Sequence, residues 1–182
     1  MTAAGTGSRF TARRTKMPNW CNNTLRISHP DPAIMEKAAA AWNDGKFLAT
    51  FVPEPDYPGY SDCEIKKTEG ESVMPDWWNW RVKNWGTKWD IGFDPDYGNS
   101  VEVVDGQITV GFVSAWSPPI QAYASMIEQG FSIQSYYFEP GCDFCGRYED
   151  GIDDCYTASE GGIPKDIDQE MGVTDTFGNY LD

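Results

Sequence analysis

A cluster of tryptophan and basic side chains offers the most unusual chemistry in this sequence. Five of the eight tryptophans fall between positions 77 and 89, interleaved with three basic residues in a chain that is acidic overall. Tryptophan and arginine are enriched at the energetic centres of protein interfaces, and aromatic rings also stack on single-stranded bases. The candidate partner-binding residues of this segment are Trp77, Trp80, Arg81, Lys83 and Lys88.

Helical spacing limits how many of these rings one core can take. At about 100° per residue, Trp78, Val82 and Trp85 share one helix face, whereas Trp77 and Trp80 fall outside it. Three interpretations therefore stay open for the cluster. The rings can pack in a core or subdomain interface, anchor a partner protein, or form a stacking platform for single-stranded nucleic acid.

A second candidate for chemistry is the Cys-x-x-Cys pair Cys142 and Cys145. Zinc takes about four ligands, and no second Cys-x-x-Cys is present. The further ligands would have to come from Cys155 and from one of Cys21, Cys63 and His29. Acidic neighbours would raise the thiol pKa rather than lower it, which disfavours a redox role. We therefore expect structural thiols and no metal or cofactor, and keep a small metal-binding protein as an alternative.

Signatures of catalysis are sparse. The single histidine, His29, directly precedes a proline in a predicted turn, and no phosphate-binding or dinucleotide-binding glycine motif is present. Paired carboxylates occur, but in a chain with 28 acidic residues such pairs are expected from abundance alone. The sequence therefore predicts a protein that is not an enzyme.

The charge is uneven along the chain. The formal charge is −14, and because residues 1–16 hold four basic residues and no acid, the remainder carries −18. This acidity argues against double-stranded DNA or an anionic membrane as partner. It also suggests that carboxylates could imitate DNA phosphates, and the candidate residues for such a surface are Asp150, Asp153 and Asp154.

The sequence shows no membrane-spanning or secretory signal. No run of about 18 apolar residues would span a membrane, and residues 1–16 lack the apolar stretch of a secretory signal. We therefore expect a cytoplasmic protein with reduced thiols, preceded by a disordered leader over residues 1–16.

Alternation and helical periodicity predict a mixed set of elements. Asp-Gly pairs at 105–106 and 150–151 are typical of tight hairpin turns. Asp31 and Ser117 are predicted helix caps, each followed by a proline. The predicted strands are 24–28, 87–93, 101–104, 107–115 and 131–137, and the predicted helices are 32–44, 77–85, 118–129 and a short one near 163–171.

The order of these elements matches a split βαβ unit. We therefore expect an α+β, ferredoxin-like antiparallel sheet with two packed helices, in the structural and not the iron–sulfur sense. The domain is expected to span 17–158, with a Trp-rich helical insertion at 46–85 and an acidic C-terminal extension at 159–182.

Four short motifs are similar to those of a known family. These are Met17-Pro-Asn-Trp-Cys-Asn-Asn23, Asn84-Trp-Gly-Thr-Lys-Trp-Asp90, Ala115-Trp-Ser-Pro-Pro119, and the segment from Glu139 to Gly146. They resemble the YubB-like family of phage and conjugative-plasmid proteins. The resemblance implies a ferredoxin-like fold, an origin in a mobile element and a native start at Met17. It implies no catalytic residues, because the family has no established biochemical activity.

The resemblance and the acidity together favour a non-enzymatic accessory protein of a phage or plasmid. It would act in the cytoplasm of a bacterial host by binding a host or defence-system protein. Counter-defence or anti-CRISPR action through a DNA-mimic surface would be one form of this. The alternatives are a single-stranded nucleic-acid binder using segment 77–89, and the metal-binding protein described above.

Overall fold

The computed structural model describes residues 19–56, 67–68, 71–72, 76–95 and 100–177. The predicted leader 1–16, Cys63 and much of the predicted insertion lie outside these described residues.

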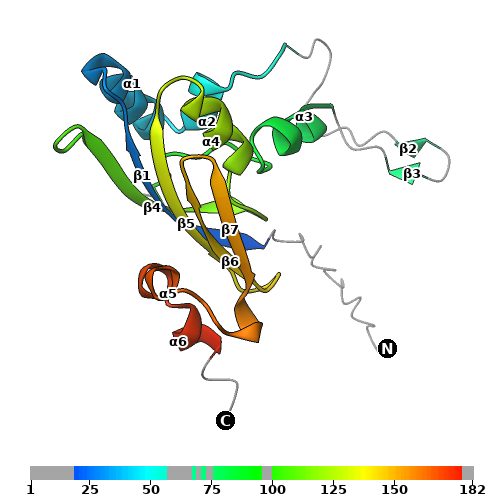
Figure 1. Ribbon diagram of the computed structural model, residues 1–182. Coiled ribbons are helices and arrows are strands. Elements are labelled where there is room, and N and C mark those ends of the chain that lie inside the picture. The colour runs from blue at the N-terminus through cyan, green and yellow to red at the C-terminus, as the bar shows by residue number, and fades with distance from the viewer. Residues whose placement is uncertain (1–18, 57–66, 69–70, 73–75, 96–99, 178–182) are drawn as a thin grey trace, which may run out of the picture.

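The centre of the fold is one antiparallel sheet with the strand order β4-β1-β5-β6-β7 (Figure 1). The N-terminal strand lies inside the sheet, between two strands that come much later in the sequence. The five strands are β1 (Trp20–Ser28), β4 (Gln107–Ala115), β5 (Ser132–Glu139), β6 (Phe144–Glu149) and β7 (Ile152–Thr157).

The strands β4 and β5 both run antiparallel to β1, and helix α4 (Ile120–Ile127) connects them. They are therefore parallel to each other with β1 between them, which is a split βαβ arrangement. The predicted α+β class is confirmed. The sheet continues beyond β5 through the hairpin of β6 and β7, so its strand number exceeds that of a simple ferredoxin-like sheet.

Helices cover one face of the sheet, where the larger core lies. Helix α1 (Pro32–Asn43) begins as predicted, because Asp31 accepts the backbone N–H of Ala33 at 2.9 Å and proline occupies the first turn. Its Trp42 packs edge-to-face on Phe47 of the short helix α2 (Phe47–Phe51). Alternate residues of β1, including Leu25 and Ile27, complete this core.

The last part of the chain covers the opposite face of the sheet. The 3-10 turn η1 (Ala158–Glu160) leads to helices α5 (Lys165–Met171) and α6 (Val173–Phe177), which lie below the sheet in Figure 1. Ile167 and Val173 are buried there against Tyr136 and Phe138 of β5. The segment predicted as an acidic extension therefore contributes a second core.

Both Asp-Gly pairs form turns with positive φ angles. Asp105 and Gly106 have φ angles of 52° and 76°, and Asp150 and Gly151 have φ angles of 42° and 98°. The predicted strand 101–104 is nevertheless wrong, because only a single bridge joins Val104 to Gln107. The physical reason lies in Asn43, whose side chain exchanges two hydrogen bonds with the backbone of Val101 and draws it into the core.

Two further predictions near the tryptophan cluster need correction. Helix α3 (Asp76–Asn84) is present, but the predicted strand 87–93 is wrong. This segment is an irregular loop, because it packs over the core and buries Thr87 and Ile91 there. Helix α4 begins at Ile120, and Ser117 donates its hydroxyl to the backbone oxygen of Gly86 instead of capping it. A small ladder of β2 (Lys67–Thr68) and β3 (Glu71–Ser72) precedes α3.

Candidate functional site

The structure divides the tryptophan cluster into buried and exposed rings. Trp85 is fully buried, and its Nε1 donates to the backbone oxygen of Val52 at 2.8 Å. Trp80 is half-buried and stands edge-to-face on Trp85, with ring centroids 5.8 Å apart. Of the predicted binding residues, Trp80 therefore packs against the core.

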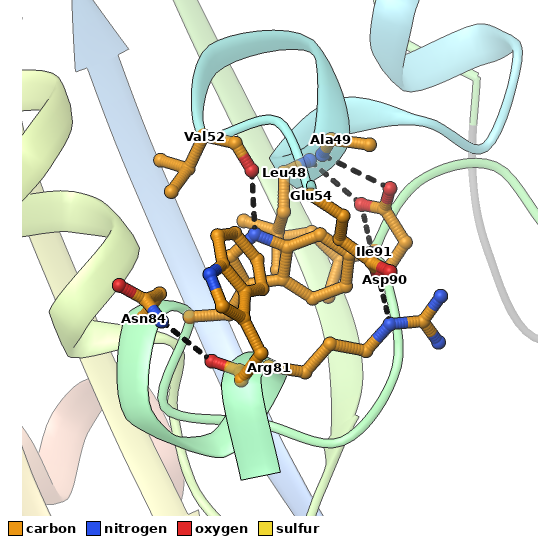
Figure 2. Close-up of polar contacts among 10 residues, drawn as sticks. Leu48, Ala49, Val52, Glu54, Arg81, Asn84, Asp90 and Ile91 are labelled. Carbon is orange, nitrogen blue, oxygen red and sulfur yellow. Dashed lines mark hydrogen bonds and ion pairs between the residues drawn. The ribbon is translucent and has the colours of Figure 1, made fainter. Parts of the chain in front are cut away.

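Arg81 lies between two rings of the cluster. Its guanidinium carbon is 5.0 Å from the ring centroids of both Trp77 and Trp85. Its Nε also forms an ion pair with Glu54, which Figure 2 shows on the side of Arg81 away from the helix. The charge of Arg81 is thus compensated within the chain, whereas Lys83 is exposed on α3.

The exposed part of the cluster contains one tryptophan that the sequence analysis did not include. Trp20 at the start of β1 lies beside Trp89, with ring centroids 5.8 Å apart and planes inclined by 37°. The exposed fractions of these two side chains are 43% and 37%. The Nζ of Lys88 is 4.5 Å from the Trp89 ring centroid, which is a cation–π distance.

Two hollows border these rings. One, with a volume of about 270 Å³, lies between the loop 89–94 and β4 and is lined by Trp20 and Trp89. The other is lined by Trp77, Arg81, Lys88 and Trp89. Because Trp89 lines both hollows, we treat Trp20, Trp77, Arg81, Lys88 and Trp89 as one surface, called here the tryptophan surface.

Asp90 fixes the loop that carries Lys88 and Trp89. Its Oδ1 accepts the backbone N–H groups of Leu48 at 2.6 Å and Ile91 at 2.8 Å, and its Oδ2 accepts that of Ala49 at 3.1 Å (Figure 2). Burial raises the pKa of this carboxyl, although the three N–H donors act in the opposite direction. The loop is therefore tied to α2, which fixes the backbone that carries Lys88 and Trp89 before any partner binds.

The three acidic candidates do not form one array. Asp150 accepts the backbone N–H of Ile133 at the end of a hairpin. Asp153 accepts the hydroxyl of Tyr137 at 2.5 Å, and Asp154 pairs with Arg147 at 2.9 Å. Adjacent strand residues point to opposite faces of a sheet, so Asp153 and Asp154 belong to different surfaces.

Asp153 and its tyrosine partner border a third hollow, of about 420 Å³, between α4 and the β6–β7 hairpin. Burial raises the pKa of Tyr137, and the hydrogen bond to Asp153 adds to this effect. The sequence offered no signal for this pair, because the two residues lie on strands separated by β6.

Cys142 and Cys145 occupy different environments. Cys142 is exposed in the turn after β5, and its sulfur accepts a hydrogen bond from Asn19 at 3.2 Å. Cys145 is buried in the second core, where loss of solvent raises the pKa of its thiol to about 11. Within the described residues, no group of three or more His, Cys, Asp or Glu side chains could hold a metal ion.

Comparisons with known proteins gave no relative. No known protein family, curated protein or solved structure matches this chain. The resemblance to the YubB-like family therefore stays a prediction. In the described part of the chain, no helix has both the length and the apolar character needed to cross a membrane.

Proposed function

We propose that this chain is a non-enzymatic accessory protein of a phage or plasmid that binds a host or defence-system protein in the bacterial cytoplasm. The observation that carries the proposal is the exposed Trp20–Trp89 pair with Lys88 above one ring. We expect neither double-stranded DNA nor a membrane to be the partner, because the chain carries a charge of −14.

The exposure of these rings and the rigidity of the loop beneath them support this proposal. Large aromatic rings left half-exposed and close together are typical of a protein-binding surface rather than of a solvated face. The loop bearing Trp89 is anchored through Asp90, so little conformational entropy would be lost on binding. The arginine and lysine beside the rings add the polar rim that such interfaces have.

This surface is a better candidate than an acidic DNA mimic. A mimic needs several carboxylates on one side that are free to meet basic groups. Asp150, Asp153 and Asp154 accept hydrogen bonds from within the chain and lie on more than one side of the sheet. We therefore place the partner at the tryptophan surface.

The test is affinity capture from a host lysate with matched variants. Wild type and the double variant Trp20→Ala/Trp89→Ala are compared with Ile152→Ala, which removes an exposed apolar side chain from a distant hairpin. We expect a protein that wild type and Ile152→Ala retain and the double variant loses. Equal capture by all three proteins, or no specific capture, would overturn the proposal.

A second candidate function is binding of single-stranded nucleic acid, which the cation of Lys88 beside the exposed Trp89 ring favours. It predicts that a labelled oligonucleotide quenches tryptophan fluorescence at low salt and that Trp89→Phe alters the effect. Unchanged fluorescence would remove this candidate and leave the first one standing.

We also propose that β1, β4 and β5 with the packed helices α1 and α4 form a ferredoxin-like arrangement, which β6 and β7 extend. The split βαβ connection around β1 supports this.

A further inference from the structure

Strand β4 forms one edge of the sheet, and the direction of its free backbone groups can be derived. Trp116 donates its N–H to the oxygen of Asn19, which marks one hydrogen-bonded pair of the ladder with β1. Since such pairs alternate along antiparallel strands, Thr109, Gly111 and Val113 direct their N–H and C=O groups away from β1. Gln107 exchanges two backbone hydrogen bonds with Val104 on the side away from β1, as this alternation requires.

The loops 89–94 and 100–105 border this edge, but the residues of β4 themselves supply none of the usual protections of an edge strand. Proteins commonly guard an exposed edge with charged residues, proline or a bulge. Gln107–Ala115 contains no charged residue and no proline, and its register with β1 is unbroken. Among the described residues, none pairs with the outward groups of Thr109, Gly111 and Val113.

The surroundings of the edge indicate what would pair with it. At one end lies the apolar hollow lined by Trp20, Trp89 and Phe112. At the other end a second hollow is lined by Glu102 and Asp105. A partner strand would therefore meet an aromatic pocket and acidic side chains. A second copy of this chain also carries a net charge of −14, so self-pairing would bring two acidic chains together, which is less favourable than pairing with a basic segment.

We propose that β4 takes up an extended, basic segment of the partner protein as an additional strand. The main chain of that segment pairs with Thr109, Gly111 and Val113, an apolar side chain enters the hollow beside Trp20 and Trp89, and lysine or arginine side chains face the acids. This inference rests on the proposed function, because the hollow is part of the tryptophan surface.

The probe is a synthetic peptide in which lysine and valine alternate four times, compared with its glutamate–valine counterpart. Gly111→Pro removes an outward N–H without touching the ladder to β1. Gly111→Ala is the matched control, because an added Cβ would meet only Asn23 O at 3.8 Å. Hydrogen exchange at Thr109 and Val113 of the wild-type chain gives a second readout that needs no variant.

We expect the lysine peptide to bind and the glutamate peptide not to bind. Binding should protect the Thr109 and Val113 amides from exchange, and Gly111→Pro should weaken it about tenfold relative to Gly111→Ala. Absence of binding at millimolar peptide, equal affinity for both variants, or unprotected amides would each overturn the inference.

Self-association has its own test. A wild-type dimer in sedimentation that Gly111→Pro converts to monomer would show that β4 pairs with a second copy, and would overturn the choice of a basic partner. Lysate capture separates this inference from the proposed function. A partner lost with Trp20→Ala/Trp89→Ala but kept by Gly111→Pro leaves the proposed function intact and removes strand addition.

Discussion

Asp90 connects the loop after α3 to helix α2, because its Oδ1 accepts the backbone N–H of Leu48 at 2.6 Å. Removing the carboxylate leaves three N–H groups without an acceptor (Figure 2). We expect Asp90→Ala to lower the free energy of unfolding by about 2–4 kcal/mol, measured by urea denaturation. Glu102→Ala, at an exposed position, is the control and should change it little; equal effects would contradict the anchoring role.

Trp85 and Trp89 should differ in how much they contribute to the free energy of unfolding. Trp85→Phe loses the hydrogen bond to Val52 and leaves a gap beside Trp80, so we expect a loss of about 2–3 kcal/mol in unfolding free energy. Trp89→Ala removes a ring that is 37% exposed and should cost less than about 1 kcal/mol. Thermal denaturation of both variants checks this, and a Trp89 effect as large as that of Trp85 would assign both rings to the core.

Gly146 is required by the Tyr137 ring. A Cβ at Gly146 would lie 2.3 Å from the Tyr137 hydroxyl oxygen and 2.5 Å from the backbone oxygen of Asp154. We expect Gly146→Ala to destabilise the protein by about 2–4 kcal/mol. Gly146→Ala should cost less stability in a Tyr137→Ala background than in wild type, because that background lacks the Tyr137 hydroxyl oxygen and Cζ at 2.3 and 2.4 Å. An equal cost in both backgrounds would mean that the contact with the backbone of Asp154 dominates.

The buried thiol of Cys145 predicts a loss of stability in alkali. Its pKa is raised from 9.0 to about 11, so the unfolded chain ionises before the folded one does. Its contribution to stability is therefore complete below pH 9 and is lost as the pH rises towards 11, by about 1–2 kcal/mol. Urea titrations across this range should show a shallower decline for Cys145→Ala than for wild type.

Reactivity of the cysteines follows from their burial. Cys142 and Cys155 are exposed, whereas Cys21 and Cys145 are buried, and burial raises the pKa of Cys21 to about 12. We expect a thiol reagent at pH 8 to modify the first two in the native protein and the other two only after unfolding. Peptide mapping by mass spectrometry checks the order, and early labelling of Cys21 would contradict the described packing.

The sequence predicted those turns and helix caps whose cause lies in residues close together in the chain. The Asp-Gly turns form because both residues must adopt positive φ, a requirement met by residue type alone. The helix after Asp31 forms because its cap lies two residues from the N–H that it binds. These features need no knowledge of the rest of the fold.

Features that depend on distant partners were not predictable. The alternation in 87–93 resembles a strand, yet Asp90 and Ile91 are held by α2 and the core instead. The pairing of Trp20 with Trp89 joins positions far apart in the chain, so a search for clustered tryptophans could not include it. The side chain of Asn43 binds the backbone of Val101 and so prevents the predicted strand 101–104. No periodicity in the sequence reveals such a contact.

The placement of β1 between β4 and β5 has a consequence for how the chain acquires its structure. The first described strand cannot complete its ladders until much of the remaining chain has been synthesised. Closing such long loops costs entropy before any pairing is gained, so folding should be slow compared with a protein of local contacts. The apolar residues of β1 such as Leu25 and Ile27 would then stay without their partner strands for longer than those of a helical protein of similar length.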